Sequence, residues 1–209
     1  MKLVKFGAAL SIALLIFTIN VISPLQCSTD SSGYVAFRLD DVGDFPWRIK
    51  TQDAVLDILL KEEVGTTLSI IPGYFGNNFD LVSKIKSGIE SGVFDIAMHG
   101  WRDENFTELT YEEQVEKIKL ANRKLRIIFG FSPKIFTPPY YEYNKETIKA
   151  LFQNTDVEII SSHLSRDNPP FPFKDDAMLH FPTTVDTAFV ADGLWHNLNA
   201  CLLYTSDAA

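Results

Sequence analysis

Short apolar runs alternate with amphipathic stretches along this chain from residue 34 onward. The apolar runs are predicted strands over residues 34–41, 66–71, 94–99, 134–137, 157–162 and 177–181. The stretches between them repeat apolar residues at helical spacing over residues 51–63, 80–92, 110–130 and 144–152. Strands that alternate with helices in this way predict an α/β fold of parallel βα units. Because the strands are continuously apolar, the sheet is expected to be covered on both faces or closed into a barrel.

Composition narrows the class of partner. The 209 residues are 46% hydrophobic, which suits one domain with a full core, and we place that domain at residues 33–196. The formal net charge of −8 argues against nucleic acid or an anionic membrane surface as the main partner, because either would select for Lys and Arg.

Both ends of the chain depart from the pattern. Lys2 and Lys5 precede an almost wholly apolar stretch, so residues 1–28 are predicted to be a signal peptide or an N-terminal membrane anchor. Either one predicts an exported domain, extracellular or at the cell surface. At the other end, residues 197–209 show no strand run, capped helix or turn, and we expect an unassigned, foreign tail on a C-terminally truncated domain.

Polar side chains gather where the predicted strands end. The residues concerned are Asp40 and Asp41 at the end of the first strand, His99 at the end of the third, Thr137 to Tyr140 at the end of the fourth, His163 at the end of the fifth and His180 at the end of the sixth. In parallel α/β folds the carboxyl ends of the strands meet at one edge, where ligands bind. This shared location predicts a functional site at that edge.

A metal site is predicted within this group. His99 and Asp103 are four residues apart, which on a helical turn brings two side chains close enough to share an ion. With Asp41 they make three protein ligands and leave positions for water and substrate, as in catalytic metal sites. The alternative is that Asp103 caps a helix or belongs to a solvated polar run.

The strand-end motifs resemble those of the polysaccharide deacetylases of carbohydrate esterase family 4, which have the NodB-homology fold. The likeness rests on residues 39–41, 98–103, 136–140 and 179–180, in the family's order. It implies a distorted (β/α) barrel of about seven parallel strands. It also implies roles: Asp40 as catalytic base, His180 as general acid, Asp41, His99 and Asp103 as ligands of one divalent metal ion, with Tyr140 and Trp101 near the sugar.

Two residues depart from the family's motifs. Asp103 stands where the family has a second metal-binding His, and Thr137 stands where it has the Arg that orients the catalytic Asp. Arg38 is expected to take over the second task, because residues 38 and 40 lie on the same face of a strand. The same alternation means that Asp40 and Asp41 cannot both point inward, so the chain must bend after Asp40.

The function expected from these observations is that of a secreted, metal-dependent hydrolase that removes acetyl groups from an N-acetylated polysaccharide. Zinc is the metal expected first, with cobalt, nickel or manganese as alternatives. Two rival functions stay open: a non-catalytic carbohydrate-binding relative of the same fold, and a glycosidase with paired carboxylates, which would need carboxyl groups about 5–9.5 Å apart on opposite sides of a sugar. His163 is a second candidate for the acid or for a further metal ligand, and the alternative is that it only hydrogen-bonds within the loop of residues 162–167.

Overall fold

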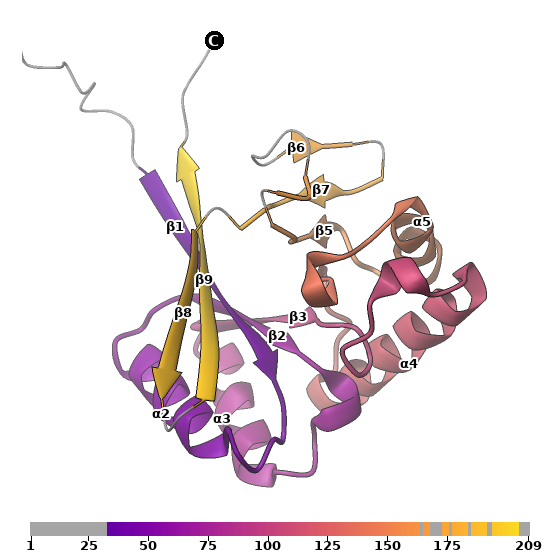
Figure 1. Cartoon of the computed structure of the whole chain (residues 1–209). Helices are drawn as coiled ribbons and strands as arrows, with labels where there is room; N and C mark the ends of the chain where they lie inside the picture. The colour runs from indigo at the N-terminus through magenta and orange to yellow at the C-terminus, as the bar shows by residue number, and fades with distance from the viewer. Residues whose placement is uncertain are drawn as a thin grey trace, which may run out of the picture. The chain divides into compact units, whose positions relative to one another are not determined.

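A single sheet runs through the part of the chain that the structure describes (Figure 1). The computed structural model describes residues 33–163, 165–167, 173–175, 177–183, 185–191 and 194–204. The strands that pair in parallel, in their order across the sheet, are β1 (Gly33–Val42), β2 (Thr66–Ile70), β3 (Phe94–Met98), β4 (Ile135–Phe136), β5 (Ile159–Ile160) and β7 (Leu179–His180). They curl into a half-barrel, which confirms the predicted α/β class and the distorted barrel.

Antiparallel strands extend the sheet at both ends. β6 (Phe173–Lys174) pairs with β7, and the hairpin of β8 (Val185–Ala191) and β9 (Leu194–Tyr204) lies beyond β1, with β9 next to β1. We expected no strand after Asn197, and β9 differs from that expectation. The missed signal is the dipeptide Asp192-Gly193 between the two strands, which favours a two-residue hairpin turn. Backbone pairing with β8 then supports a strand that has no clear hydrophobic alternation.

Four helices connect the parallel strands, where the sequence predicts them. They are α2 (Ile49–Lys61), α3 (Phe79–Glu90), α4 (Tyr111–Phe129) and α5 (Lys145–Asn154), within the described residues. Two of them begin at a capping box, with Thr110 and Glu113 at α4 and Asn144 and Thr147 at α5. Gly130 ends α4 in the left-handed conformation, at a φ of 88°. Short 3-10 turns, η1 (Pro72–Tyr74), η2 (Phe106–Glu108) and η3 (Pro139–Tyr141), follow β2, β3 and β4.

The two faces of the sheet carry different residues. On the helix side, Leu39, Leu68, Ile96, Phe136 and Ile160 join the helices in the hydrophobic core. Each such side chain, when fully buried, contributes about 1.5–3 kcal/mol. Because side chains alternate along a strand, the residues between them face the inside of the half-barrel. The inner face therefore receives Arg38 and Asp40 from β1 and Ser161 from the end of β5.

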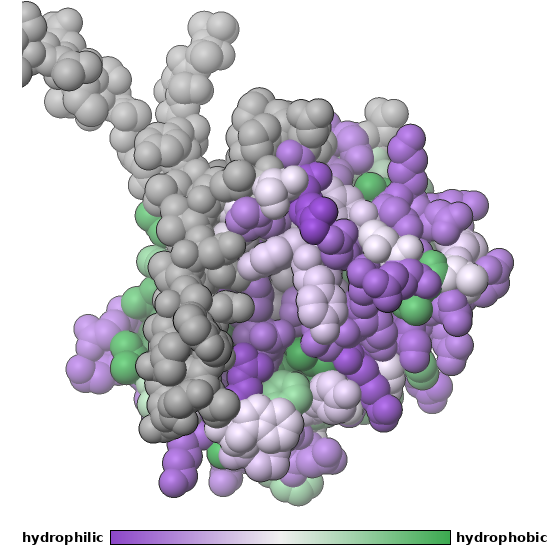
Figure 2. Space-filling view, viewed as in Figure 1, coloured by the Kyte–Doolittle hydropathy of each residue, from purple (hydrophilic) through white to green (hydrophobic). Residues whose placement is uncertain are grey.

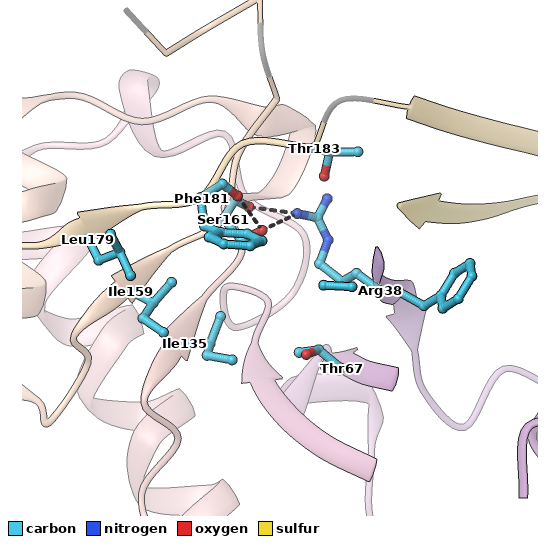
Figure 3. Close-up of a pocket in the computed structure, with 10 residues that line it drawn as sticks. Arg38, Thr67, Ile135, Ile159, Ser161, Leu179, Phe181 and Thr183 are labelled. Carbon is cyan, nitrogen blue, oxygen red and sulfur yellow. Dashed lines mark hydrogen bonds between the residues drawn. The ribbon is translucent and has the colours of Figure 1, made fainter. Parts of the chain in front are cut away.

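The inner face encloses an apolar pocket of about 170 Å³ (Figure 3). Ile135, Ile159, Leu179 and Phe181 lie along it, and Arg38 borders it. The guanidinium of Arg38 reaches across to Ser161 on the far wall, and this polar contact separates the apolar interior from the strand ends.

The predictions for the chain termini concern residues outside this description. The predicted signal or anchor at residues 1–28 and the last residues, 205–209, lie outside the described part, so both remain predictions. No helix among the described residues is both long enough and apolar enough to cross a membrane.

Candidate functional site

The end of β1 separates its two acidic residues. The pairing with β2 shifts register between Leu39 and Val42, and Asp41 takes a φ of 61°, in the left-handed region. The expected bend after Asp40 is therefore present. It leaves Asp40 on the inner face and turns Asp41 toward His99 at the end of β3. Positive φ at a residue other than glycine is costly and is often found at functional sites.

Asp40 is buried in a two-pronged ion pair with Arg38. Nε of Arg38 donates to Oδ1 of Asp40 at 2.7 Å, and Nη2 donates to Oδ2 at 2.9 Å. The side chains are only 6% and 7% exposed. Burial alone raises the pKa of Asp40, but the charge and hydrogen bonds of Arg38 outweigh burial and bring this pKa below its ordinary value. Arg38 thus holds Asp40 ionised and fixed in orientation.

Ser161 fixes Arg38 from the opposite wall. Nη1 of Arg38 donates to the carbonyl oxygen of Ser161 at 2.9 Å and to its Oγ at 2.6 Å (Figure 3). The ring of Tyr141 lies 5.7 Å from the guanidinium carbon. Arg38 therefore connects β1 with the end of β5 through the inside of the half-barrel. Nothing in the sequence spacing identifies Ser161, because it is 123 residues from Arg38.

Asp41, His99 and Asp103 converge beside Asp40. One potential ligand atom from each lies within 4.8 Å of the other two. Nε2 of His99 is 3.3 Å from Oδ1 of Asp41, while Nδ1 of His99 lies 2.8 Å from the carbonyl oxygen of Thr137, to which it donates. That bond turns Nε2 toward the two carboxylates, where it would offer its lone pair to a bound metal ion in place of its proton, the usual orientation of a metal-binding histidine.

Opposite charges shift the pKa values of Asp41 and His99. Burial raises the pKa of Asp41, but His99 and Arg48 outweigh it and lower the pKa to about 2. Burial lowers the pKa of His99, but hydrogen bonding to Asp41 and the charges of both aspartates outweigh it and raise this pKa. Arg48 contacts Asp41 from α2, with Nη2 3.3 Å from Oδ2. The sequence did not mark Arg48, which lies seven residues beyond Asp41.

Asp103 is held by its loop and by Tyr140. It has a φ of 73°, and Oδ2 accepts a hydrogen bond from the Tyr140 hydroxyl at 3.0 Å. Burial raises the pKa of Asp103, the Tyr140 bond lowers it, and the charge of Asp41 raises it further, so the net direction is upward. Glu104 stabilises the same loop, because its Oε2 accepts from the backbone N–H groups of Trp101 and Arg102, each at 2.9 Å.

These residues line one pocket of about 280 Å³, at the carboxyl ends of β1, β3 and β4. The lining residues are Asp40, Asp41, His99, Asp103, Tyr140 and Tyr141. Tyr140 is 61% exposed, and both tyrosines have positive φ. Trp101, predicted to lie near the sugar, packs partly buried against the hydrophobic core and does not line this pocket.

The structure does not bring His180 into this pocket. Leu179 and Phe181 line the inner pocket (Figure 3), so His180 between them points to the opposite face. There its Nε2 lies 3.0 Å from Oδ2 of Asp175, and its Nδ1 lies 3.8 Å from Oδ1 of Asp167. Burial lowers the pKa of His180, but the two aspartates outweigh burial and raise it.

His163 lies beside one of the pocket residues. Its ring centroid is 5.2 Å from that of Tyr141, which lines the pocket. Nδ1 of His163 interacts with Oγ of Ser165 at 2.7 Å.

Comparison with known proteins identifies the family. A family model described as polysaccharide deacetylase matches residues 29–156, which is more than half of the chain. The chain belongs to the polysaccharide deacetylase family. A search of curated proteins finds no match.

Solved structures agree with this fold. A family 4 carbohydrate esterase from Streptomyces lividans, solved with acetate, is 20% identical, with a TM-score of 0.50, and the match covers 61% of this chain and 62% of the esterase. IcaB from Ammonifex degensii is 16% identical, with a TM-score of 0.50, and the match covers 60% of this chain and 57% of IcaB. A 4-alpha-glucanotransferase from Thermococcus litoralis is 16% identical, with a TM-score of 0.56, and the match covers 71% of this chain and 27% of the glucanotransferase. The chain thus spans less than two thirds of each, and at these identities the likeness concerns the fold.

Within this deacetylase fold, Thr137 cannot act as the orienting arginine of the motif. Its side chain is fully buried, and its Oγ1 accepts a hydrogen bond from Oγ of Ser69 at 2.9 Å. The contacts that orient Asp40 come instead from Arg38, on the same strand as that aspartate. This placement agrees with the expectation drawn from strand alternation.

The first prediction concerns the free energy of unfolding. Arg38→Met should destabilise the protein by about 3–5 kcal/mol, because it removes the guanidinium that contacts both oxygens of the buried, charged Asp40. Adding Asp40→Leu removes that charge, so the double variant should be more stable than the sum of the single effects implies. Chemical denaturation of all four proteins in the cycle measures the coupling.

A matched exposed pair provides the control for this cycle. Lys134 and Glu158 have side chains that are 56% and 69% exposed, and the same cycle with Lys134→Met and Glu158→Leu should give a coupling below about 1 kcal/mol. Additive effects for Arg38 and Asp40, within about 0.5 kcal/mol, would show that Arg38 does not stabilise the charge of Asp40.

Proposed function

We propose that this protein is a secreted, metal-dependent deacetylase that hydrolyses N-acetyl groups of a polysaccharide. One observation carries the proposal: an ionised, oriented Asp40 lies in the same pocket as the converging side chains of Asp41, His99 and Asp103. Family membership supports a polysaccharide as the substrate. Two of the three pocket carboxylates, those of Asp41 and Asp103, converge with His99 on one point, whereas a glycosidase pair faces across a sugar ring.

The three converging side chains fit one divalent ion. Asp41 and Asp103 offer carboxylate oxygens, and His99 offers Nε2, held toward them by its bond to Thr137. Three protein ligands leave the open positions that a catalytic site requires. When bound, such an ion supplies Lewis-acid chemistry, which polarises a carbonyl oxygen and makes water more acidic. Zinc suits this mixed nitrogen and oxygen set, and cobalt, nickel or manganese are alternatives.

Asp40 is the proposed catalytic base. Its low pKa keeps it ionised at neutral pH, and the fork of Arg38 fixes its orientation toward the pocket. It would accept a proton from the attacking water while the acetyl group lies in the pocket beside Tyr140 and Tyr141.

The leaving amine needs a proton from a general acid. His180 has the raised pKa that this role requires and is the residue implied by the family's motif, but it faces away from the pocket. His163 lies beside Tyr141 on the pocket side. We retain His180 as the proposed acid, with His163 as the alternative.

The substrate would be met outside the cell. The N-terminal sequence supports export through a signal, or attachment of the domain through an anchor, as the only membrane contact. The net charge of −8 gives no support to nucleic acid as a partner.

Acetate release tests the proposed function. The zinc-loaded protein should release acetate from N-acetylated chito-oligosaccharides, and treatment with a chelator should abolish the activity. Asp40→Asn should lower kcat by about 10²–10⁴-fold, because it removes the base. A metal-loaded, folded protein that binds the oligosaccharide without releasing acetate would instead be a non-catalytic binding relative.

A second prediction distinguishes the two candidate acids. Loss of the true acid, in His180→Gln or His163→Gln, should lower kcat on the oligosaccharide by about 10²–10⁴-fold. The same variant should hydrolyse 4-nitrophenyl acetate nearly as well as the wild type, because that leaving group needs no proton. If His180→Gln retains the activity of the wild type on the oligosaccharide as well as on 4-nitrophenyl acetate, His180 is excluded from this role.

A third prediction concerns the ligand set. Asp103→His should tighten zinc binding, because imidazole is a softer ligand than carboxylate. Competition with a fluorescent zinc chelator measures the affinity. Asp80→His, which changes an exposed carboxylate on α3, is the control and should leave the affinity unaltered. Unchanged or weaker zinc binding in Asp103→His would show that residue 103 is not a ligand.

A further inference from the structure

Three aromatic rings lie together on the loops that follow β1 and β2. The ring centroid of Phe45 is 5.3 Å from that of Trp47 and 5.4 Å from that of Tyr74. Trp47 is 62% exposed and Tyr74 is 41% exposed, so two large rings are open to solvent. We call Phe45, Trp47 and Tyr74 the aromatic platform. The sequence motifs did not mark any of its members.

Hydrogen bonds between the two loops hold the platform in place. The N–H of Asp44 donates to the carbonyl oxygen of Tyr74 at 2.6 Å, and Oδ2 of Asp44 accepts from the N–H of Asn77 at 2.6 Å. The ring of Phe45 lies over Gly43, where an added Cβ would be 2.6 Å from Cε2 of that ring. The exposed rings are therefore presented on a fixed backbone.

Two arginines lie against the platform, and one of them also contacts a residue of the catalytic pocket. The guanidinium carbon of Arg48 lies 5.7 Å from the ring centroid of Phe45, and its Nη2 is 3.3 Å from Oδ2 of Asp41. The guanidinium carbon of Arg102, next to Asp103, lies 5.9 Å from the ring centroid of Tyr74. Arg48 thus contacts both a platform ring and a proposed metal ligand, whereas Arg102 contacts a platform ring and directly precedes a proposed metal ligand in the sequence. Within the described residues, Arg102 has no carboxylate partner in an ion pair.

In the described part of the chain, the other exposed apolar side chains do not bring two exposed rings together: Phe131, 39% exposed, pairs only with Phe129, which packs against the hydrophobic core. Phe79 is 83% exposed, Ile127 72% and Phe152 60%, and none of these pairs with another ring among the described residues. The coloured surface in Figure 2 is mostly hydrophilic, with its hydrophobic residues in small patches. Single exposed apolar residues are ordinary on protein surfaces, whereas a fixed group of rings marks a binding site.

We propose that the aromatic platform is a sugar-binding subsite, which holds a second pyranose ring of the same polysaccharide whose acetylated sugar occupies the pocket. This inference rests on the proposed function for the identity of the occupant. The chemistry matches a sugar: the C–H face of a pyranose packs on aromatic rings, and tryptophan and tyrosine combine an apolar face with a polar edge. The guanidinium groups at the platform donate hydrogen bonds to ring hydroxyls.

The proposal predicts that affinity depends on chain length. The Asp40→Asn variant, which is not expected to turn over substrate, is titrated calorimetrically with N-acetylglucosamine, chitohexaose and xylohexaose. Adding Trp47→Ala or Tyr74→Ala should weaken hexamer binding by roughly three- to tenfold, the range that corresponds to loss of one aromatic contact. Binding of the monosaccharide should not change, and Trp47→Tyr should retain most of the hexamer affinity.

Phe152→Ala is the matched control, because Phe152 has nearly the same exposure as Trp47 and lies on α5. It should leave the affinity for both hexamers unaltered. The proposed role of the platform would be overturned by any of three results. These are equal hexamer affinities with and without Trp47→Ala, an equal loss of affinity for the monosaccharide and the hexamer, and no binding of either hexamer. Acetate release by the protein with Asp40 intact is measured separately, so failure of the platform can be distinguished from failure of the proposed activity.

Discussion

The ion pair between Arg38 and Asp40 determines how the rest of the site can be built. A carboxylate that is 7% exposed would carry a desolvation cost of several kcal/mol, and it stays ionised here because a guanidinium fork contacts both of its oxygens. Arg38 in turn depends on Ser161, at the end of β5. The proposed base, Asp40, is thus positioned by the closure of the half-barrel itself, and not by β1 alone.

The bend at Asp41 follows from the same constraint. If β1 continued regularly, Asp41 would face the hydrophobic core beside Leu39, where its charge would have no partner. The left-handed φ of 61° instead turns it toward His99 and Arg48. Asp103, Tyr140 and Tyr141 also adopt positive φ, and all four residues line the pocket. Strain of about 1–3 kcal/mol for such a residue concentrates at this site, as is common where a structure holds reactive groups in place.

The sequence predicts this fold well where the signals are local. The alternation of strands and helices, the capping box of Thr110 with Glu113, and the shared face of residues 38 and 40 all follow from spacing of a few residues. Partners brought together from distant segments could not be predicted, because spacing does not encode tertiary contact. Ser161 on Arg38 and Tyr140 on Asp103 are examples. The face on which His180 lies could not be predicted without the strand register, since a shift of one residue moves a side chain to the other face of a sheet.

The central claim is a division of labour: Asp41, with His99 and Asp103, holds the metal, while Asp40 stays free of it and bound to Arg38. A crystal structure of the zinc-loaded protein, with the ion located by its anomalous scattering, tests this claim most directly. We expect one ion ligated by Asp41, His99 and Asp103, with the fork between Arg38 and Asp40 intact. An ion ligated by Asp40, or one that Asp103 does not ligate, would contradict it.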